Sequence, residues 1–372
     1  MKKIFLISII AYSLFSFNRY YSLKDTPENL RELYNSSPEK WPKPNIDNGV
    51  LFSELGPLPK MGYPKDNLYS REKNQLGKML FFDPRLSKSG SIACASCHDP
   101  ELGWADGRPQ SFGHARRKGN RNSMSIINTG YYSSLFWDGR ASNLEEQLLF
   151  PIQDHSEMNM SIDSLINNLN KITGYKSKFR EVFGENTIKI EYIQKALATF
   201  ERSIVSRKSA FDAFLEGKSS ALTDQQILGL HLFRTKARCI NCHNGPFFTN
   251  QQFHNNGQSH LGRPSEDLGL YLISGDTADV GKFRTPSLRD VTFTGPWLHN
   301  GLLYQLEEVI GMYNIGMPQV IPKSHQESPL YPEKSPLLKP LSLNKEEKEA
   351  LIAFLESISS KPYRLSIPKL PE

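Results

Sequence analysis

Cysteine is scarce in this chain, with four residues among 372, and no pattern of alternating polar and apolar residues is prominent. The sequence therefore gives no sign of a protein built mainly from strands. Long apolar runs are also scarce, since the run over residues 4–17 is short for a membrane-spanning helix. No charge of one sign dominates: 45 Lys and Arg stand against 39 Asp and Glu, and the basic residues are scattered. This distribution argues against a nucleic-acid-binding protein.

All four cysteines lie in two copies of one pattern, Cys-x-x-Cys-His. The copies are Cys94-Ala95-Ser96-Cys97-His98 and Cys239-Ile240-Asn241-Cys242-His243. The pattern is typical of c-type haem attachment, in which two thiols bind the porphyrin and the histidine binds the iron. Residues three and four apart share one face of a helical turn, so these groups can converge on one macrocycle. We therefore expect two covalently bound haem c groups and no disulfide.

Two other uses of paired cysteines stay open at this point. A zinc site needs four ligands with closed geometry, which each pentapeptide alone does not supply. A redox-active dithiol does not need the same following histidine twice. Attachment of haem accounts for every residue of the pattern in both copies.

The positions of the two motifs predict two domains. His98 and His243 are 145 positions apart (243 − 98), which suits two cytochrome c-like domains in an all-α fold with long loops and one haem in each. The expected units are residues 1–21 (signal peptide or N-terminal anchor), 22–59 (irregular lead-in), 60–206 (N-terminal peroxidatic domain) and 207–372 (C-terminal electron-transfer domain). Both halves share one order of opening helix, motif, long loop and closing helix, which indicates an internal repeat.

Helical periodicity and capping signals place the main helices. They are expected over residues 74–82, 142–149, 161–182, 190–205, 223–233, 306–313 and 344–357. Ser142 followed by Glu145, and Thr223 followed by Gln226, have the spacing of capping boxes.

The first residues resemble a secretory signal, because Lys2 and Lys3 precede the apolar run. No clean cleavage site of small residues follows, so an uncleaved membrane anchor remains an alternative. Bacteria attach c-type haem outside the cytoplasm, and we therefore expect a periplasmic protein.

Segments around the two motifs resemble the bacterial di-haem cytochrome c peroxidases, a family that includes the cofactor-maturing enzyme MauG. The resemblance covers roughly residues 60–360 and rests on the segments 80–87 (LFFDPRLS), 136–140 (FWDGR), 144–147 (LEEQ), 157–158 (EM), 283–289 (FRTPSLR) and 299–301 (HNG). It implies that the N-terminal haem reacts with peroxide and that the C-terminal haem passes electrons to it.

The resemblance also implies roles for individual residues. Glu157 matches the family's distal glutamate, which would move a proton between the two peroxide oxygens, and Gln147 matches a second distal position. Trp137 matches the tryptophan between the haems, and His114 matches a removable sixth ligand of the first iron. Ordinary structural roles remain open for all four, on the surface, in the core or in an exposed loop.

A metal ion between the haems is implied as well. The side chain of Asn122 and the backbone carbonyls of Thr294 and Pro296 match the family's calcium site. Oxygen donors suit this hard cation.

The distal ligand of the C-terminal haem is where this chain departs from the classical peroxidases. They place methionine there, which raises the redox potential. The matching position here is Tyr313, as in MauG-like members, with Met312 as the alternative ligand. A tyrosinate ligand would lower the potential of this haem.

The sequence therefore favours a periplasmic di-haem peroxidase that reduces hydrogen peroxide to water. Its electrons would come from a small c-type cytochrome or a cupredoxin-like donor. The sequence is also compatible with a homodimer. One alternative is a MauG-like enzyme that uses peroxide to oxidise a protein partner. Another is a non-catalytic di-haem electron-transfer protein.

Overall fold

The computed structural model describes residues 27–361 and 364–372, which are rich in helix and poor in sheet. The α-helices are α1 (Pro27–Tyr34), α2 (Arg71–Phe81), α3 (Leu144–Gln147), α4 (Leu149–Gln153), α5 (Ile162–Asn170), α6 (Thr173–Phe183), α7 (Ile190–Arg202), α8 (Ala210–Leu215), α9 (Asp224–Arg234), α10 (Tyr271–Ser274), α11 (Leu306–Asn314) and α12 (Lys345–Ser357). Two short strands, β1 (Phe253–Asn255) and β2 (Lys282–Arg284), pair antiparallel. The expectation of helices joined by long loops is confirmed.

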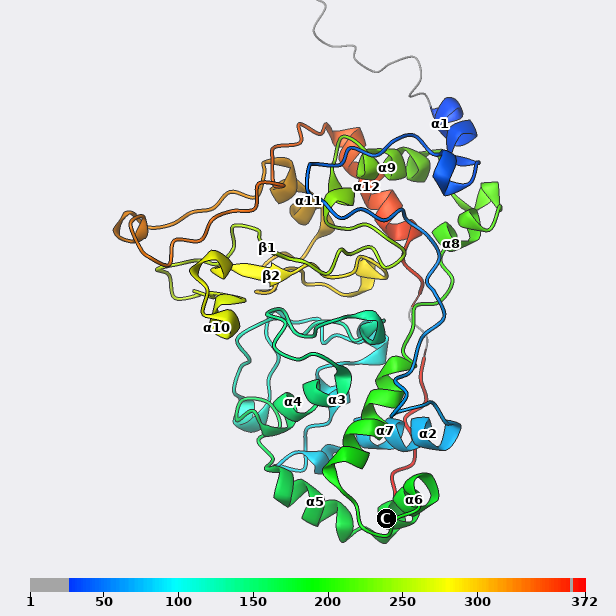
Figure 1. The fold of residues 1–372 in the computed structure, drawn as a ribbon, viewed down its shortest axis with the longest axis vertical. Helices are drawn as coiled ribbons and strands as arrows, with labels where there is room; N and C mark the ends of the chain where they lie inside the picture. The colour runs from blue at the N-terminus through cyan, green and yellow to red at the C-terminus, as the bar shows by residue number, and fades with distance from the viewer. Residues whose placement is uncertain (1–26, 362–363) are drawn as a thin grey trace, which may run out of the picture.

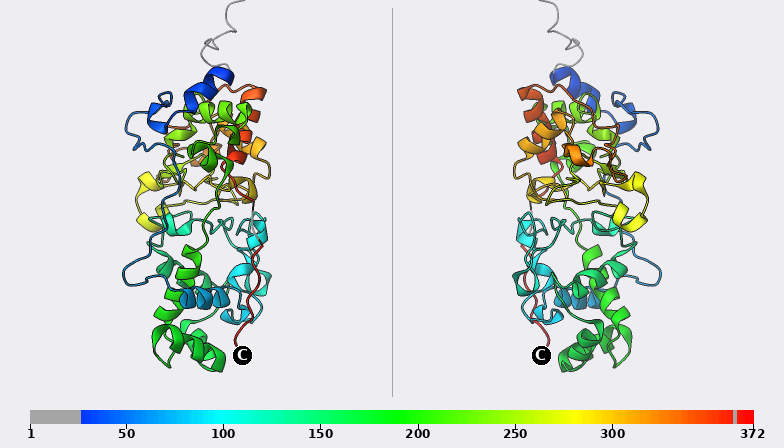
Figure 2. Two further views of the ribbon diagram at one scale, coloured as in Figure 1. Left: turned by 90° about the vertical axis from the view of Figure 1, so that its right-hand side faces the viewer. Right: turned by 90° about the vertical axis from the view of Figure 1, so that its left-hand side faces the viewer.

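The helices divide between two hydrophobic cores, which define a first lobe and a second lobe. The core of the first lobe is built from α2 to α7, and that of the second lobe from α1, α8, α9, α11 and α12. The lobes lie one above the other along the long axis of the molecule (Figure 1 and Figure 2). Each lobe contains one Cys-x-x-Cys-His motif. The cytochrome c-like character of the lobes stays a prediction.

Each lobe contains a close crossing of two helices at which a glycine is required. In the first lobe α2 crosses α7, and Gly77 faces the carbonyl group of Ala196. In the second lobe α9 crosses α12, and Gly229 faces the carbonyl group of Ala350 in the same way. A Cβ atom at either glycine would overlap that carbonyl oxygen, so the helices could not approach as closely. This shared feature supports the predicted internal repeat.

The N-terminal lead-in is less irregular than the sequence suggested. It contains α1, whose Leu30 and Tyr34 are buried in the core of the second lobe together with Trp41 and Leu55. The indole nitrogen of Trp41 donates a hydrogen bond to the carbonyl of Tyr34 at 3.0 Å. A segment that precedes the first motif in sequence therefore completes the lobe that holds the second.

The helix starts agree with the capping signals in one case and differ in the other. Thr223 caps α9 in a capping box with Gln226, as predicted. The cap of α3 is Asn143, whose side chain accepts from the backbone N–H of Glu146, and not Ser142. Two good capping residues are adjacent in the sequence, and Ser142 instead donates to the carboxylate of Glu146 at 2.6 Å.

The C-terminal segment runs back from the second lobe to the first. The carbonyl oxygen of Glu372 accepts from the backbone N–H of Gly174 at 2.7 Å, at the start of α6 (Figure 1). Arg85 donates to the carbonyl of Pro371 at 2.9 Å. The lobes are thus connected by the chain three times: before α2, between α7 and α8, and through this C-terminal segment. None of the described helices is both long and apolar enough to cross a lipid bilayer, and the predicted signal or anchor over residues 1–21 lies outside the described residues.

Candidate functional site

The two Cys-x-x-Cys-His motifs adopt the same local structure, a single 3-10 turn that begins at the first cysteine. The backbone N–H of His98 donates to the carbonyl of Cys94 at 3.0 Å, and that of His243 to the carbonyl of Cys239 at 2.8 Å. In the second motif the two cysteines and the histidine line one cavity; that the three groups of the first motif converge in the same way stays a prediction.

Both imidazoles are held in the orientation that suits an iron ligand. Nδ1 of His98 lies 3.2 Å from the carbonyl oxygen of Trp104, and Nδ1 of His243 lies 3.2 Å from that of Phe248. A hydrogen bond from Nδ1–H to each carbonyl leaves Nε2 as the metal-binding nitrogen. Burial lowers the pKa of His98 and lowers that of His243 to about 4, so both rings are neutral at pH 7. Neutral imidazole is the form that binds iron.

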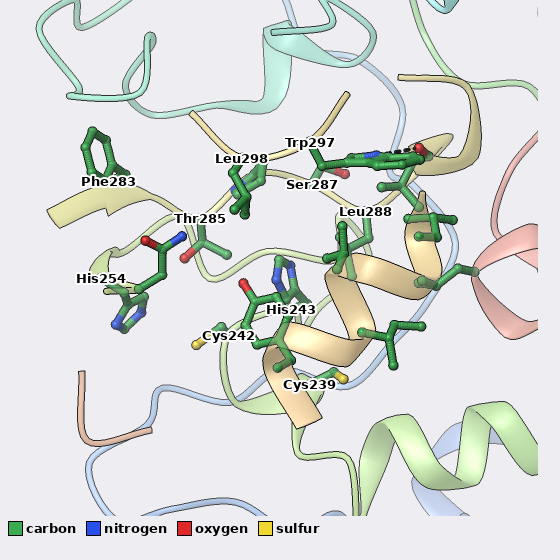
Figure 3. A pocket seen from close by; sticks show the side chains of 18 of the residues that line it. Cys239, Cys242, His243, His254, Phe283, Thr285, Ser287, Leu288, Trp297 and Leu298 are labelled. Carbon is green, nitrogen blue, oxygen red and sulfur yellow. Dashed lines mark hydrogen bonds between the residues drawn. The ribbon is translucent and has the colours of Figure 1, made fainter. Parts of the chain in front are cut away.

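An apolar cavity of about 250 Å³ adjoins the second motif. Cys239 and Cys242 flank His243 at its edge (Figure 3). Its apolar lining comes mainly from α11, α12 and the loop before α11, including Leu306, Val309, Ile310, Leu351, Leu355, Trp297 and Leu298. Residues of the first lobe also reach it, among them Met124, Tyr132 and Trp137. The cavity is therefore closed by both lobes.

Three residues that line this cavity each have a buried side-chain nitrogen without a hydrogen-bond partner among the described residues. These nitrogens are Nε of Arg238, Nη1 of Arg284 and Nδ1 of His299. Leaving such a group unsatisfied costs roughly 1–3 kcal/mol, and more for a charged group. The porphyrin of haem is a flat apolar ring with two anionic propionates. An apolar cavity that has arginines among its lining residues, beside two thiols and an imidazole, fits that group.

The placement of Tyr313 bears on the choice between the two predicted distal ligands. Tyr313 lines the cavity, whereas its neighbour Met312 is not among the described residues that do so. Burial, together with the nearby Cys242 and Cys239, raises the pKa of the Tyr313 phenol. A bound metal cation reverses such a preference because it stabilises the anionic ligand. The placement favours Tyr313, whose ligation of iron stays a prediction.

Glu157 lies close to the first motif and is partly buried. The thiols of Cys94 and Cys97 are both within electrostatic reach of its carboxyl group. Burial, reinforced by the neighbouring Asp154, raises the pKa of Glu157 to about 7, against a smaller opposing effect of Arg140. A carboxyl group with this pKa exchanges protons readily near neutral pH.

His114 lies on a strained loop that contacts Glu157. Its backbone N–H donates to the carbonyl of Glu157 at 2.7 Å, and its Nδ1 is buried without a partner among the described residues. Ala115 and Arg116 follow in left-handed conformations, with φ of 55° and 58°. Such conformations are costly for residues other than glycine and occur often at sites that rearrange. Gln147 ends α3 in the same lobe, with its backbone N–H bonded to the carbonyl of Asn143.

Trp137 lies between the lobes. Its indole nitrogen donates to the carbonyl of Asn122 at 3.0 Å, and its ring centroid is 6.4 Å from that of His299. The backbone N–H of Asn122 donates to the carbonyl of His299 at 2.7 Å. These contacts fix the indole at the cavity wall beside a residue of the second lobe, and so bring together the predicted relay residue and the second site.

The residues predicted to bind calcium share the wall of the same cavity. Asn122, Thr294 and Pro296 all line it, and the Gly295–Pro296 peptide bond is cis. The amide nitrogen of Asn122 donates to the carbonyl of Arg108 at 2.8 Å. The described residues contain no cluster of three or more His, Cys, Asp or Glu that could hold a metal ion. A calcium site built from an amide and carbonyl oxygens stays a prediction.

Comparison with known proteins identifies the family of this chain. Residues 71–220 match the family model described as di-haem cytochrome c peroxidase. The cytochrome-c peroxidase IdrP1 of Pseudomonas sp. (strain SCT) is 38% identical over 354 residues, which cover 87% of this chain and 90% of that protein. The chain belongs to the di-haem cytochrome c peroxidase family. The peroxidase is therefore an oxidoreductase, and its family implies two haem groups.

The peroxidase is also similar to MauG-like members of the family. It is 38% identical over 313 residues to the methylamine utilization protein MauG of Methylorubrum extorquens, covering 83% of this chain and 84% of that protein. A solved structure of a MauG-like protein associated with microbial copper homeostasis superposes with a TM-score of 0.73 at 32% identity, covering 82% of this chain and 99% of that one. Its relatives thus include both cytochrome c peroxidases and MauG-like proteins, the two branches that the sequence resembles.

Two features of the peroxidase were not found from the sequence. Arg284 lies in the segment 283–289, on which the family resemblance partly rests. Nothing in the neighbouring sequence indicated that one of its side-chain nitrogens is buried without a hydrogen-bond partner. Glu201 is buried in α7, and burial raises its pKa to about 8. A signal for Glu201 was present: it lies four residues after Leu197, which belongs to the apolar stripe that predicted the helix.

Proposed function

We propose that this peroxidase reduces hydrogen peroxide to water in the periplasm with electrons from a small c-type cytochrome or a cupredoxin-like donor. The reaction balances as one peroxide, two electrons and two protons giving two waters. Haem covalently bound through Cys94 and Cys97, with His98 on the iron, would supply the binding position for peroxide. A second haem, bound through Cys239, Cys242 and His243, would supply electrons.

The observation that carries this proposal is the partly buried carboxyl group of Glu157 beside the first motif, with its raised pKa. Reduction of peroxide requires a proton to move from one oxygen to the other while the O–O bond breaks. The carboxylate of Glu157 accepts the first proton and returns it to the departing oxygen. Its pKa of about 7 makes both steps accessible at neutral pH. Gln147 is proposed to hold the peroxide or a water beside it.

The remaining residues have proposed roles in gating and in electron transfer. His114 closes the peroxide position at rest, and the strained turn at Ala115 and Arg116 lets it leave. Trp137 relays electrons between the lobes, supported by its fixed place at the cavity wall. A calcium ion at Asn122, Thr294 and Pro296 would hold the two lobes in register.

The test of this function is peroxide consumption by the purified holoprotein with a reduced cytochrome as donor. Two haems per chain, measured as the pyridine haemochrome, come first. We expect Glu157→Gln to retain both haems and to lower turnover by about 10²–10⁴-fold, the usual contribution of a general acid–base group. Glu101→Gln, an exposed carboxylate of the same lobe, serves as the matched control and should leave turnover unchanged. Turnover of Glu157→Gln within about twofold of wild type would contradict the assignment.

A second candidate function is the MauG-like oxidation of a protein partner. The place of Tyr313 in the second cavity favours it, since a tyrosinate ligand stabilises the oxidised state of that haem. A haem of low potential is a poor acceptor from a high-potential cytochrome. The redox potential of the second haem distinguishes the two functions.

A further inference from the structure

Arg284 connects the second lobe to the backbone around Trp137. It ends β2, and its guanidinium extends into the first lobe, where Nε donates to the carbonyl of Phe136 at 3.1 Å and Nη2 to Sδ of Met124 at 3.4 Å. The guanidinium carbon lies 3.7 Å from the ring centroid of Tyr132. Its own backbone N–H donates to the carbonyl of Trp137 at 2.8 Å. One residue therefore holds both peptide carbonyls next to the indole.

Within the described part of the chain, the positive charge of Arg284 is not paired with a carboxylate, whereas the charges of the other buried arginines are. Its side chain is 2% exposed, Nη1 has no hydrogen-bond partner, and the described residues give it no carboxylate. The other buried arginines each have one, in the pairs Arg202–Glu145, Arg234–Glu54 and Arg289–Asp212. A buried cation without an anion is strongly destabilising. Among the described residues, the fold thus leaves the cation of Arg284 without a group of opposite charge.

The cavity of the second motif is where that anion would lie. Arg284 lines it, together with Cys239, Cys242 and His243. Its other two side-chain nitrogens are already engaged by the first lobe, so that only Nη1 is left for a ligand. The ligand expected in this cavity carries two carboxylates of its own.

We propose that Nη1 of Arg284 binds a propionate of the haem attached at Cys239 and Cys242, and that Arg284 thereby positions Trp137 relative to that haem. This inference rests on the proposed attachment of haem at the second motif. Arg284 is a positioning residue, because it acts on the electron path through the backbone of Phe136 and Trp137. The same side chain also sets the local charge that the second iron experiences.

The first test removes the charge. Arg284→Gln keeps a polar side chain but no cation, and loss of a positive charge favours Fe(III) over Fe(II). We expect the Fe(III)/Fe(II) equilibrium of the second haem, followed by its own signal in a potentiometric titration, to shift about tenfold toward Fe(III), the order of magnitude expected for one nearby charge at a partly buried site. An unchanged equilibrium in a protein with two haems per chain would overturn the proposal.

A matched control is available in the same cavity wall. Arg289 is also a buried arginine that lines the cavity, but it is paired with Asp212 at 3.1 Å. The double variant Arg289→Gln with Asp212→Asn removes a neutral pair, and its equilibrium should stay within about twofold of wild type, since no net charge is lost. An equal shift in this double variant would show that any disturbance of the wall has the effect, and would also overturn the proposal.

The second test separates the charge from the positioning role. Arg284→Lys keeps the cation but loses the Nε donor to Phe136 and the flat contact with Tyr132. We expect the equilibrium of the second haem to return to within about threefold of wild type, while electron transfer between the haems in the half-reduced protein slows at least tenfold. Transfer at the wild-type rate in both Arg284 variants would refute the positioning role.

The infrared difference spectrum between the oxidised and reduced protein reports directly on the proposed contact between Arg284 and a haem propionate. It can be measured on any variant that folds. With haem labelled by ¹³C at the propionates, the carboxylate bands should shift in Arg284→Lys and not in the Arg289–Asp212 double variant. Bands identical to wild type would contradict the contact. A protein with one haem per chain would instead contradict the proposed function, so the two failures are distinguishable.

Discussion

Glu157, near the first motif, and its neighbour Asp154 differ in burial. Glu157 is partly buried, and burial raises its pKa to about 7. Asp154 is exposed and contributes to that rise as a nearby negative charge.

This difference predicts the pH dependence of turnover. Glu157 must be ionised to accept the first proton, so kcat/KM should fall as the pH drops below about 7. Asp154→Asn removes a negative charge that raises the pKa of Glu157, and the acid limb should therefore move to lower pH. A profile measured between pH 5 and pH 9 checks both statements. An acid limb that persists unchanged in Glu157→Gln would assign it to another group.

At the second motif, the prediction that separates the two candidate functions concerns Tyr313. An anionic phenolate favours Fe(III), whereas a thioether favours Fe(II) and raises the potential. If Tyr313 binds the second iron, as in the MauG-like alternative, we predict a low potential for that haem and a large rise in Tyr313→Met, measured by spectroelectrochemistry. Met312→Leu is the control and should leave the potential unchanged, since Met312 is not among the described residues that line the cavity. A wild-type potential in the range of His/Met cytochromes would identify Met312 as the ligand.

At the scale of the elements, the two helix crossings are the clearest sign of the repeat. Gly77 on α2 and Gly229 on α9 each face a carbonyl oxygen of the closing helix, and neither has space for a Cβ atom. We predict that Gly77→Ala and Gly229→Ala lower the free energy of unfolding by about 1–3 kcal/mol, the usual cost of overpacking. Urea denaturation of the holoprotein measures the change.

A third helical glycine provides the control for these two variants. Gly311 on α11 has open space where a Cβ atom would lie. Gly311→Ala should be neutral or stabilising by about 0.5–1 kcal/mol, because alanine loses less conformational entropy in a helix. If all three variants were equally destabilised, close approach of the helices would not be the cause.

The closing helix α7 also contains a buried acid, Glu201, whose pKa is raised to about 8 by burial. The protonated form is favoured in the folded state, so its contribution to stability is complete below about pH 4.5 and is lost as the pH rises through about 8. Glu201→Gln removes this dependence. Unfolding free energies at pH 5, 7 and 9 should therefore fall less steeply with pH in the variant than in wild type.

Helices were predictable from the sequence where apolar residues recur with helical spacing. The stripe over 190–205 predicted α7 (Ile190–Arg202), and the Thr223–Gln226 pair located the start of α9. The helix α1 was not predicted, because eight residues offer too little periodicity and its apolar face is stabilised by packing on α9. Arg31 of α1 pairs with Asp224 of α9 at 2.6 Å, a contact between residues 193 positions apart. Such long-range partners leave no local signal.

At the scale of the whole molecule, the two lobes are joined by contacts that place the predicted site residues. Arg121 of the first lobe forms a two-pronged pair with Asp267 of the second, and Asn122 next to it bonds to the backbone of His299. Motifs and family resemblance led to the predictions for Glu157, Trp137 and the residues of the two Cys-x-x-Cys-His motifs. They did not reveal that the second cavity is closed by both lobes, because that depends on the docking of loops far apart in sequence.

The central claim is that the first motif holds an iron with a position open to peroxide, while the second haem supplies electrons. Low-temperature electron paramagnetic resonance of the oxidised and half-reduced holoprotein tests it most directly, with His114→Gly as the comparison. We predict that half-reduction leaves a ferric signal from the first haem that is high spin, and that His114→Gly shows this signal already when fully oxidised. Two low-spin, six-coordinate haems in both redox states of both proteins would contradict the account and identify a non-catalytic electron carrier.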